Sequence, residues 1–332
     1  MNKHLKAALG LSAAMTGASL QPALAQENLP GLAVSSFPSP TASFWFSHLI
    51  PKLGLDRKHG FRLTVEAKPS QVAYSDFISG ASKACYCIAT AAAARFVERG
   101  ADISQVWIVQ TNVSYIVTGD PAIKSAKDLE GKTLAADTAT GAWAVAASLI
   151  SRAGTDLKKV RIQPGSISNS LIELSRGRVD AAVATSALDF IRINQEQPDK
   201  YRLIVLGNDK ATFEATGGKG IPYWGFGAWN EWLRQPANAD LSRKLYAASI
   251  DLIGLLRSDT DRIAGEVAEV AKVDKQAFLA ETRNYWTYHL GPASDYEKGI
   301  RLLGSDFLPA GKQIDAPLTE SAYRTLISDF KP

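Results

Sequence analysis

The sequence predicts an α/β protein of two lobes, each a mainly parallel sheet flanked by helices, with a helical C-terminal extension. Two successive runs of short apolar strands that alternate with helices predict this class, because such alternation is typical of βαβ units. The third observation is the change past Gly207, where a glycine-rich segment leads into mostly helical patterns. A chain of 332 residues, 46% of them hydrophobic, is long enough for two lobes.

The first run occupies the N-terminal third of the chain. Strands are expected at residues 31–37, 61–67, 84–89 and 105–118, because these segments are apolar, rich in β-branched residues or alternating. A helix should begin near Thr41 and be interrupted or bent at Pro51. A second helix is expected at 71–78, and Thr90 could cap an alanine-rich third helix that ends at Gly100.

The second run repeats the pattern. Strands are expected at 133–136, 160–163, 179–184 and 201–206, with helices at 142–153, 169–175 and 188–195. The C-terminal helices are expected at 240–256, 259–271, 274–284, 293–303 and 319–328. No low-complexity linker separates the two runs, so we expect crossing strands to join the lobes.

Residues 1–25 have the pattern of a signal peptide. Lys3 and Lys6 precede an apolar alanine-rich stretch, and Ala23-Leu24-Ala25 forms a cleavage site of the A-x-A type. The apolar stretch is shorter than the roughly 20 residues that a membrane-spanning helix needs. We therefore expect export, with a soluble mature protein in a bacterial periplasm.

The two cysteines, Cys85 and Cys87, lie in one expected strand. An oxidising compartment permits a disulfide. Residues i and i+2 of a strand are separated by nearly the largest distance that a disulfide can span, so the spacing favours two buried thiols. Without a nearby histidine, the pair does not indicate a zinc site.

Several phrases follow one another in the order seen in a known family. They are Leu53-Gly54-Leu55-Asp56-Arg57-Lys58-His59-Gly60-Phe61, Phe77-Ile78-Ser79-Gly80, A-R-F-V-E-R-G-A-D at 94–102, I-K-S-A-K-D-L-E-G-K-T at 123–133, and G-R-V-D-A-A-V at 177–183. This ordered set resembles the periplasmic substrate-binding proteins of ABC importers, in the branch that includes sulfonate-, taurine- and nitrate-binding proteins and pyrimidine-precursor binders.

The resemblance implies a type II periplasmic-binding-protein fold. One lobe would take residues 26–115 and 216–332, and the other would take 116–215. The ligand would lie in the cleft, and the closed form would dock on an ABC permease in the inner membrane. The chain departs from the family pattern at 84–87 and at Thr185-Ser186-Ala187, where a proline is frequent, so the resemblance does not identify the ligand.

In open α/β sheets, ligands bind beyond the C-terminal ends of strands, at the starts of helices. Hydroxyl, amide and aromatic residues at these places would hold the head of a small organic anion by neutral donors and its body by rings. Sulfonates and aromatic or short-chain carboxylates fit this description. The expected ligand-binding residues are Ser36, Phe37, Thr41, Gln71, Tyr74, Thr90, Thr138, Thr140, Gly141, Trp143, Ser168, Asn169, Thr185, Tyr223 and Trp224.

Each hydroxyl in that set has an alternative role as a simple helix cap. Asp137 would compete with an anionic ligand for the amides at the helix start, or would select a ligand that also carries a donor. Tyr223 and Trp224 could equally pack beneath the C-terminal helices. The hypothesis predicts that Thr138→Ala or Thr140→Ala weakens binding more than folding, whereas Lys132→Ala, in the turn before the strand, affects neither.

Other chemistry has little support. Gly131-Lys132-Thr133 lacks the earlier glycine of a phosphate-binding loop, and Gly225-x-Gly227 lacks the third glycine of a dinucleotide fingerprint. We expect no catalytic residue, cofactor or metal, and a formal net charge of only +4 without a basic run does not indicate nucleic acid. Two alternatives remain beside a monomeric import protein: an enzyme on the same scaffold, like the pyrimidine-precursor synthases with their Cys-rich motif, and a binding protein that serves a sensor.

Overall fold

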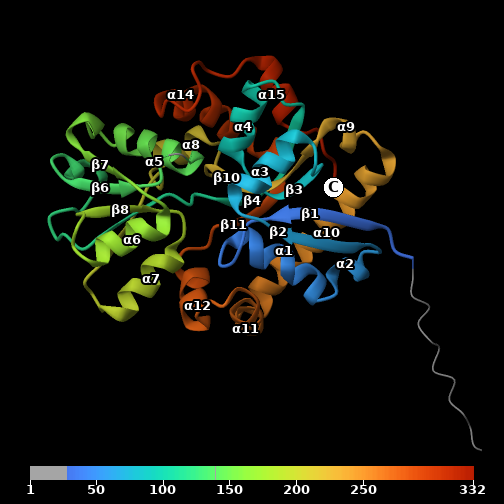
Figure 1. The fold of residues 1–332 in the computed structure, drawn as a ribbon, viewed down its shortest axis with the longest axis horizontal. Coiled ribbons are helices and arrows are strands. Elements are labelled where there is room, and N and C mark those ends of the chain that lie inside the picture. The colour runs from blue at the N-terminus through green and yellow to red at the C-terminus, as the bar shows by residue number, and fades with distance from the viewer. Residues whose placement is uncertain (1–27, 139) are drawn as a thin grey trace, which may run out of the picture.

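The computed structural model describes residues 28–138 and 140–332, without the side chains of residues 167 and 168. The expected signal peptide, residues 1–25, lies outside the described residues. Two sheets with their helices form two lobes that lie side by side (Figure 1). In the described part of the chain, no helix is long and apolar enough to cross a membrane.

The first lobe is built on a six-stranded sheet in the order β11-β4-β10-β3-β1-β2. Its strands are β1 (Gly31–Ser36), β2 (Arg62–Ala67), β3 (Ala84–Ala89), β4 (Ile103–Thr111), β10 (Pro222–Trp229) and β11 (Tyr288–Pro292). Strands β1, β2 and β3 are parallel, β10 runs antiparallel between β3 and β4, and β11 is antiparallel to β4. Four of the six strands therefore share one direction.

The helices of this lobe come from both ends of the chain. The N-terminal ones are α1 (Ala42–Lys52), α2 (Leu55–Lys58), α3 (Ser70–Ser79) and α4 (Thr90–Glu98). The C-terminal ones are α9 (Asn230–Leu233), α10 (Pro236–Ser258), α11 (Thr260–Ala271), α12 (Lys275–Asn284), α13 (Glu297–Leu302), α14 (Leu308–Ala310) and α15 (Glu320–Leu326), with short turns η3 (Ala293–Tyr296) and η4 (Leu303–Phe307). Helix α1 ends one residue after Pro51, as expected.

The second lobe is built on a five-stranded sheet in the order β7-β6-β8-β5-β9. Its strands are β5 (Tyr115–Thr118), β6 (Thr133–Ala136), β7 (Arg161–Pro164), β8 (Ala181–Ala184) and β9 (Arg202–Val205), and only β5 runs against the others. Its helices are α5 (Gly141–Arg152), α6 (Ile167–Ser175), α7 (Ala187–Glu196) and α8 (Lys210–Ala215), with turns η1 (Ala126–Leu129) and η2 (Leu157–Lys159). The predicted fold class is confirmed, although β11 and α8 were not expected.

Each sheet separates two apolar clusters. In the first lobe, one cluster joins α1, α10 and α11 to the face of the sheet that carries Trp107 and Phe226, whose rings stack at 4.3 Å. The cluster on the other face contains the disulfide and the alanine-rich side of α4. Strand β3 serves both faces, because Tyr86 points to the first cluster while Cys85 and Cys87 point to the second.

The prediction of two free thiols is wrong, because Cys85 and Cys87 form a disulfide. Their Cα atoms are 5.2 Å apart, within the range that a disulfide spans. The register between β3 and β10 shifts between Gly225 and Gly227, so β3 carries one extra residue in this stretch. A bulge of this kind bends the strand and brings residues i and i+2 closer than regular spacing allows.

The glycines of β10 are required by close packing between strands. A Cβ at Gly225 would lie 2.0 Å from the carbonyl oxygen of Trp107, and a Cβ at Gly227 would lie 2.6 Å from Ile88 Cγ2. No side chain fits at either distance. The glycine pattern of this segment therefore serves the central strand of the sheet.

Candidate ligand site between the two lobes

A cavity of about 360 Å³ lies between the lobes, which is a size typical of small-molecule sites. Its walls come from the ends of β1, β3 and β10, the starts of α1 and α7, and the C-terminal α12 and β11. The lining residues are Phe37, Pro40, Thr41, Ala42, Ser43, Trp45, Cys87, Ala89, Gln110, Asp137, Ser166, Thr185, Ser186, Leu188, Asp189, Tyr223, Trp224, Glu281 and Tyr288. Both lobes therefore contribute to one site.

Five aromatic side chains form much of the wall: Phe37, Trp45, Tyr223, Trp224 and Tyr288. The rings of Trp45 and Tyr288 meet edge to face at 5.4 Å. The indole N–H of Trp224 donates to Gln110 Oε1 at 2.6 Å, which satisfies that donor within the wall. Such rings offer a large, firmly held apolar surface to a ligand.

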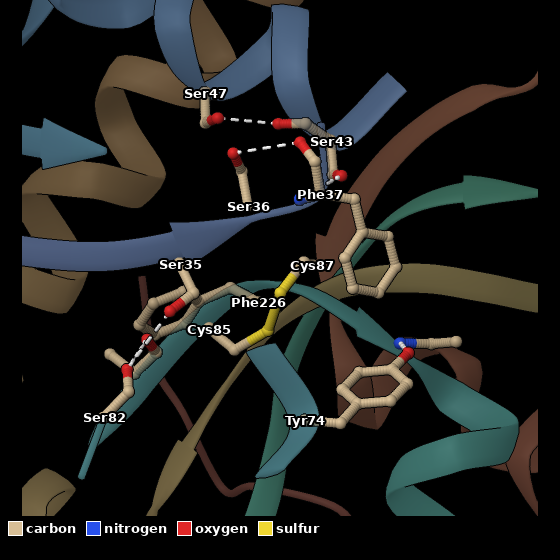
Figure 2. Close-up of a disulfide and its surroundings, with 12 residues drawn as sticks. Ser35, Ser36, Phe37, Ser43, Ser47, Tyr74, Ser82, Cys85, Cys87 and Phe226 are labelled. Carbon is tan, nitrogen blue, oxygen red and sulfur yellow. Dashed lines mark hydrogen bonds between the residues drawn. A yellow bond between two sulfur atoms is a disulfide. The ribbon is translucent and has the colours of Figure 1, made fainter. Parts of the chain in front are cut away.

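The disulfide stands behind part of this wall. Cys87 lines the cavity, and Phe37 and Tyr74 pack against the cluster that contains both cysteines (Figure 2). Phe37 and Tyr74 meet edge to face at 5.3 Å, and the Tyr74 hydroxyl accepts a hydrogen bond from the Ala89 N–H at 3.2 Å. Tyr74 therefore supports Phe37 from behind.

The charged residues of the lining are all acidic. Asp137, Asp189 and Glu281 contribute carboxyl groups, and no lysine, arginine or histidine lines the cavity in the part of the chain that the structure describes. Burial raises the pKa of Asp189, and the neighbouring Arg192 opposes that rise. Burial also raises the pKa of Glu281, against the effect of its hydrogen bond from Ser186.

Glu281 connects the two lobes. Its Oε1 atom, on α12 of the first lobe, accepts hydrogen bonds from Ser186 Oγ at 2.7 Å and from the Leu188 N–H at 3.1 Å, both at the start of α7 in the second lobe. The N-terminus of a helix is a favourable place for an anion. Here a carboxylate of the protein itself takes that place. Figure 1 shows α12 beside α7.

Other helix starts around the cavity are capped by their own side chains. Thr41 Oγ1 accepts from the Phe44 N–H, Thr140 Oγ1 from the Trp143 N–H, and Ser166 Oγ from the Asn169 N–H. These bonds use donors that an anionic ligand would otherwise need.

Five residues of the expected site line the cavity: Phe37, Thr41, Thr185, Tyr223 and Trp224. Trp45 is 3% exposed and belongs to the apolar cluster of the first lobe, and it also lines the cavity.

Other members of the expected site lie near the cavity without lining it. Ser36 is buried and donates from Oγ to the Phe37 carbonyl at 3.2 Å. Thr90 is also buried, but the prediction that it caps α4 is wrong: Ala89 is the N-cap residue, and Thr90 is the first residue of the helix. Thr90 Oγ1 has no hydrogen-bond partner among the described residues.

The stretch from Thr138 to Trp143 serves mainly to place α5. Thr138 is half-buried, and Thr140 caps the helix. Gly141 lies against α4, where an added Cβ would be 2.6 Å from Ala91 Cβ. Trp143 packs against the apolar cluster of the second lobe. These residues set how closely the two lobes approach.

Of the remaining residues of the expected site, Gln71 and Asn169 do not line the cavity. Gln71 is exposed in the first turn of α3. Asn169 is exposed on α6 and lines a different hollow, which lies beside Gln163 and Gly165. Ser168 belongs to α6, and its side chain lies outside the described part of the structure.

Sequence reasoning missed Asp189, Glu281 and Tyr288. Glu281 and Tyr288 belong to the C-terminal part, which the strand-end rule does not reach. Asp189 lies two residues past Ala187, the first residue of α7, so a wider window after β8 would have included it. Within residues 28–138 and 140–332, no group of three or more His, Cys, Asp or Glu residues is placed to hold a metal ion.

Comparisons with known proteins agree with this architecture. Residues 69–210 match the model of the family described as NMT1/THI5 like. No curated protein matches the chain.

Similar solved structures cover most of the chain at low sequence identity. The alkanesulfonate-binding protein SsuA from Xanthomonas axonopodis pv. citri, bound to MOPS, has 15% identity and a TM-score of 0.69, over 88% of this chain and 97% of that one. The periplasmic aliphatic sulphonate-binding protein SsuA from Escherichia coli has 12% identity and a TM-score of 0.70, over 91% and 92%. The protein named sulfonate ABC transporter, periplasmic sulfonate-binding protein SsuA, from Methylobacillus flagellatus KT has 15% identity and a TM-score of 0.65, over 91% and 92%.

These likenesses agree with the resemblance seen in the order of the sequence phrases. Residues 69–210 match the NMT1/THI5-like family model, and the 88% to 91% of the chain that these solved structures cover has the fold of the periplasmic binding proteins.

Proposed function

We propose that this protein is the substrate-binding component of an ABC importer, which captures one small organic molecule between its lobes in the periplasm and delivers it to a permease in the inner membrane. The observation that carries the proposal is the cavity of about 360 Å³ walled by both lobes and by five aromatic rings. A ligand that touches both walls binds best when the lobes are together, so it stabilises the closed form.

Binding without turnover suits the chemistry of the cavity. The enzyme alternative relied on a cysteine motif, but Cys87, the cysteine that lines the cavity, is held in a disulfide with Cys85. A disulfide sulfur is not the thiolate nucleophile that cysteine catalysis requires. The aromatic wall, in contrast, suits the retention of a whole molecule.

The sequence favoured an organic anion, such as a sulfonate or an aromatic or short-chain carboxylate. The likeness to sulfonate-binding proteins supports this ligand class. Three hydroxyl-bearing residues, Thr41, Ser43 and Thr185, line the cavity, although Thr41 Oγ1 already donates to the Pro38 carbonyl at 2.9 Å. An anion would rely on such neutral donors. A pyrimidine-precursor type of ligand is the other candidate that the family suggests.

A thermal-shift screen of the purified mature protein tests the proposed function. The compounds would be sulfonates, aromatic acids, short carboxylates, amines and pyrimidines. A true ligand at free concentration L stabilises the folded state by RT ln(1 + L/Kd), so the unfolding temperature rises with the logarithm of its concentration once that exceeds Kd. Selective stabilisation by one class, with the compound recovered unchanged, is the expected result. Conversion of the compound into a product, or no stabilisation by any class, would contradict the proposal.

A further inference from the structure

The cavity has an unbalanced charge. Three carboxyl groups line it, and no basic side chain among the described residues does so. Asp189 has one basic partner in the described part of the chain, Arg192, whose Nη2 lies 3.9 Å from Asp189 Oδ1 and whose side chain is 62% exposed. Because the guanidinium of Arg192 is largely exposed, water screens its charge. Arg192 therefore offsets little of the negative charge inside the cavity.

The helix start that would best bind an anion, at α7, is already occupied by the carboxylate of Glu281. Glu281 Oε1 accepts from Ser186 and from the Leu188 N–H at the start of α7. Glu281 therefore already uses hydrogen-bond donors of the α7 start that an anionic ligand would need. A second anion beside Glu281 and Asp189 would meet like charges in a site of low dielectric constant, which is strongly unfavourable.

The aromatic wall fits a cation as well as an apolar body. Trp45, Tyr223, Trp224 and Tyr288 belong to the residue types that attract an ammonium group to the face of the ring. Tyr288 and Glu281 come from the same C-terminal segment and line one cavity, so a single cationic group could contact a ring and a carboxylate together.

We propose that the inter-lobe cavity binds a small organic cation, a protonated amine or amidine carried on an aromatic or apolar body, with Glu281 and Asp189 as its counter-charges. This inference rests on the proposed function and names its ligand class. Closure on such a ligand neutralises a charge that the empty cavity leaves uncompensated. The ligand thereby strengthens the contact between α12 and α7.

The test uses three probes of similar size, each with one benzene ring: benzylammonium, benzyl alcohol and benzoate. Isothermal titration of the full mature chain at low salt should rank benzylammonium first and benzoate last, and added salt should weaken benzylammonium binding. Benzylamine is protonated at neutral pH, so the three probes differ mainly in charge.

Two variants test whether Glu281 and Asp189 supply the negative charge that binds the cation. Glu281→Gln keeps an oxygen that can accept from Ser186 and Leu188, but it removes the charge, and it should weaken benzylammonium binding about tenfold or more. Asp189→Asn should act in the same direction. Glu196→Gln is the matched control, because Glu196 is exposed on α7 and does not line the cavity.

The outcomes separate the two proposals. If benzoate or benzyl alcohol binds as tightly as benzylammonium, or if Glu281→Gln and Glu196→Gln bind the amine equally well, the charge assignment is wrong and the binding function stands. The same holds if an anion is the selective ligand of the broad screen. If no compound of any class binds, the proposed function itself fails. Circular dichroism of each variant establishes that a loss of binding does not arise from unfolding.

Discussion

At the scale of single residues, the same hydroxyl can cap a helix or hold a ligand, and local bonding decides between the two. Thr140 Oγ1 accepts from the Trp143 N–H and donates to the Asp137 carbonyl at 2.8 Å. Both hydrogen bonds of this hydroxyl are therefore made to backbone groups within three residues of Thr140. Thr41 is also a cap, but it lines the cavity as well. A residue type at a helix start does not reveal which of these situations holds.

We predict that Thr140→Ala lowers the free energy of unfolding by about 0.5–2 kcal/mol, the usual cost of losing an N-cap. Ligand affinity should change little, because Thr140 does not line the cavity. Chemical denaturation and titration of the same sample measure both quantities. Thr138→Ala is the neighbouring control, since its side chain caps no helix. A loss of affinity without a loss of stability in Thr140→Ala would restore the role that the sequence suggested.

At the scale of elements, the contact between α12 and α7 joins a helix of the C-terminal extension to the second lobe. Glu281 is 8% exposed, and its carboxyl group faces Asp189, Tyr115 and Tyr288. Burial raises the pKa of both tyrosines, so they stay neutral at physiological pH. Asp189 is then the charged neighbour that most opposes the ionisation of Glu281.

The raised pKa of Glu281 predicts a pH dependence of stability. A carboxyl group with a higher pKa in the folded state binds more protons there than in the unfolded chain, so its contribution to stability falls as pH rises past its ordinary value, about 4.5. The free energy of unfolding of the unliganded protein should therefore fall as pH rises from about 4.5 towards 7, because Glu281 becomes ionised in its buried position. Asp189 should add to this loss, because burial raises its pKa too.

Urea denaturation of the unliganded protein at pH 5 and pH 7.5 measures this effect. Glu281→Gln should gain stability relative to the natural protein at pH 7.5 and show a smaller difference at pH 5. Glu196→Gln, whose side chain is exposed at the end of α7, should behave like the natural protein at both pH values. An equal difference between Glu281→Gln and the natural protein at both pH values would show that Glu281 does not titrate in this range.

At the scale of the whole molecule, the distance between the lobes depends on a few close contacts. The start of α5 meets α4 at Gly141 and Ala91, and Gly311 of the C-terminal part lies against Ala144 of α5, where a Cβ would be 3.0 Å from the Ala144 Cα. On the far side of the cavity, α12 contacts α7. The observed arrangement of the two lobes therefore needs small residues at Gly141 and Gly311.

Gly141→Val should hold the lobes apart, because an added Cβ would lie 2.6 Å from Ala91 Cβ. We expect a larger radius of gyration in the presence of ligand and a weaker affinity, measured by small-angle X-ray scattering and titration. Gly254→Ala is the control: nothing lies within 4 Å of its Cβ position on α10, so it should keep the affinity and stabilise the helix by about 0.5–1 kcal/mol. Unchanged scattering and affinity in Gly141→Val would show that this contact does not limit closure.

The sequence alone determines the class of this fold and most of its elements. Strand β3 at Ala84–Ala89 and strand β6 at Thr133–Ala136 have the bounds that apolar runs and their flanking residues predict. Local residue preferences and hydrophobic periodicity are sufficient to place these two strands, because each strand is marked by an apolar run within its own few residues. The strand-end rule also found Phe37, Thr41 and Thr185 for the cavity, and the aromatic residues after the glycine-rich segment added Tyr223 and Trp224.

The tertiary structure decides what local pattern cannot encode. The bulge that brings Cys85 and Cys87 together depends on pairing with β10, which lies far along the chain. Glu281 appears in its own sequence as an ordinary polar residue of a helix, and it becomes a buried carboxylate of the cavity only because α12 packs against α7. The charge of the cavity depends on side chains from distant segments, because Coulomb interactions follow distance in space and burial, and neither is visible in the order of the residues.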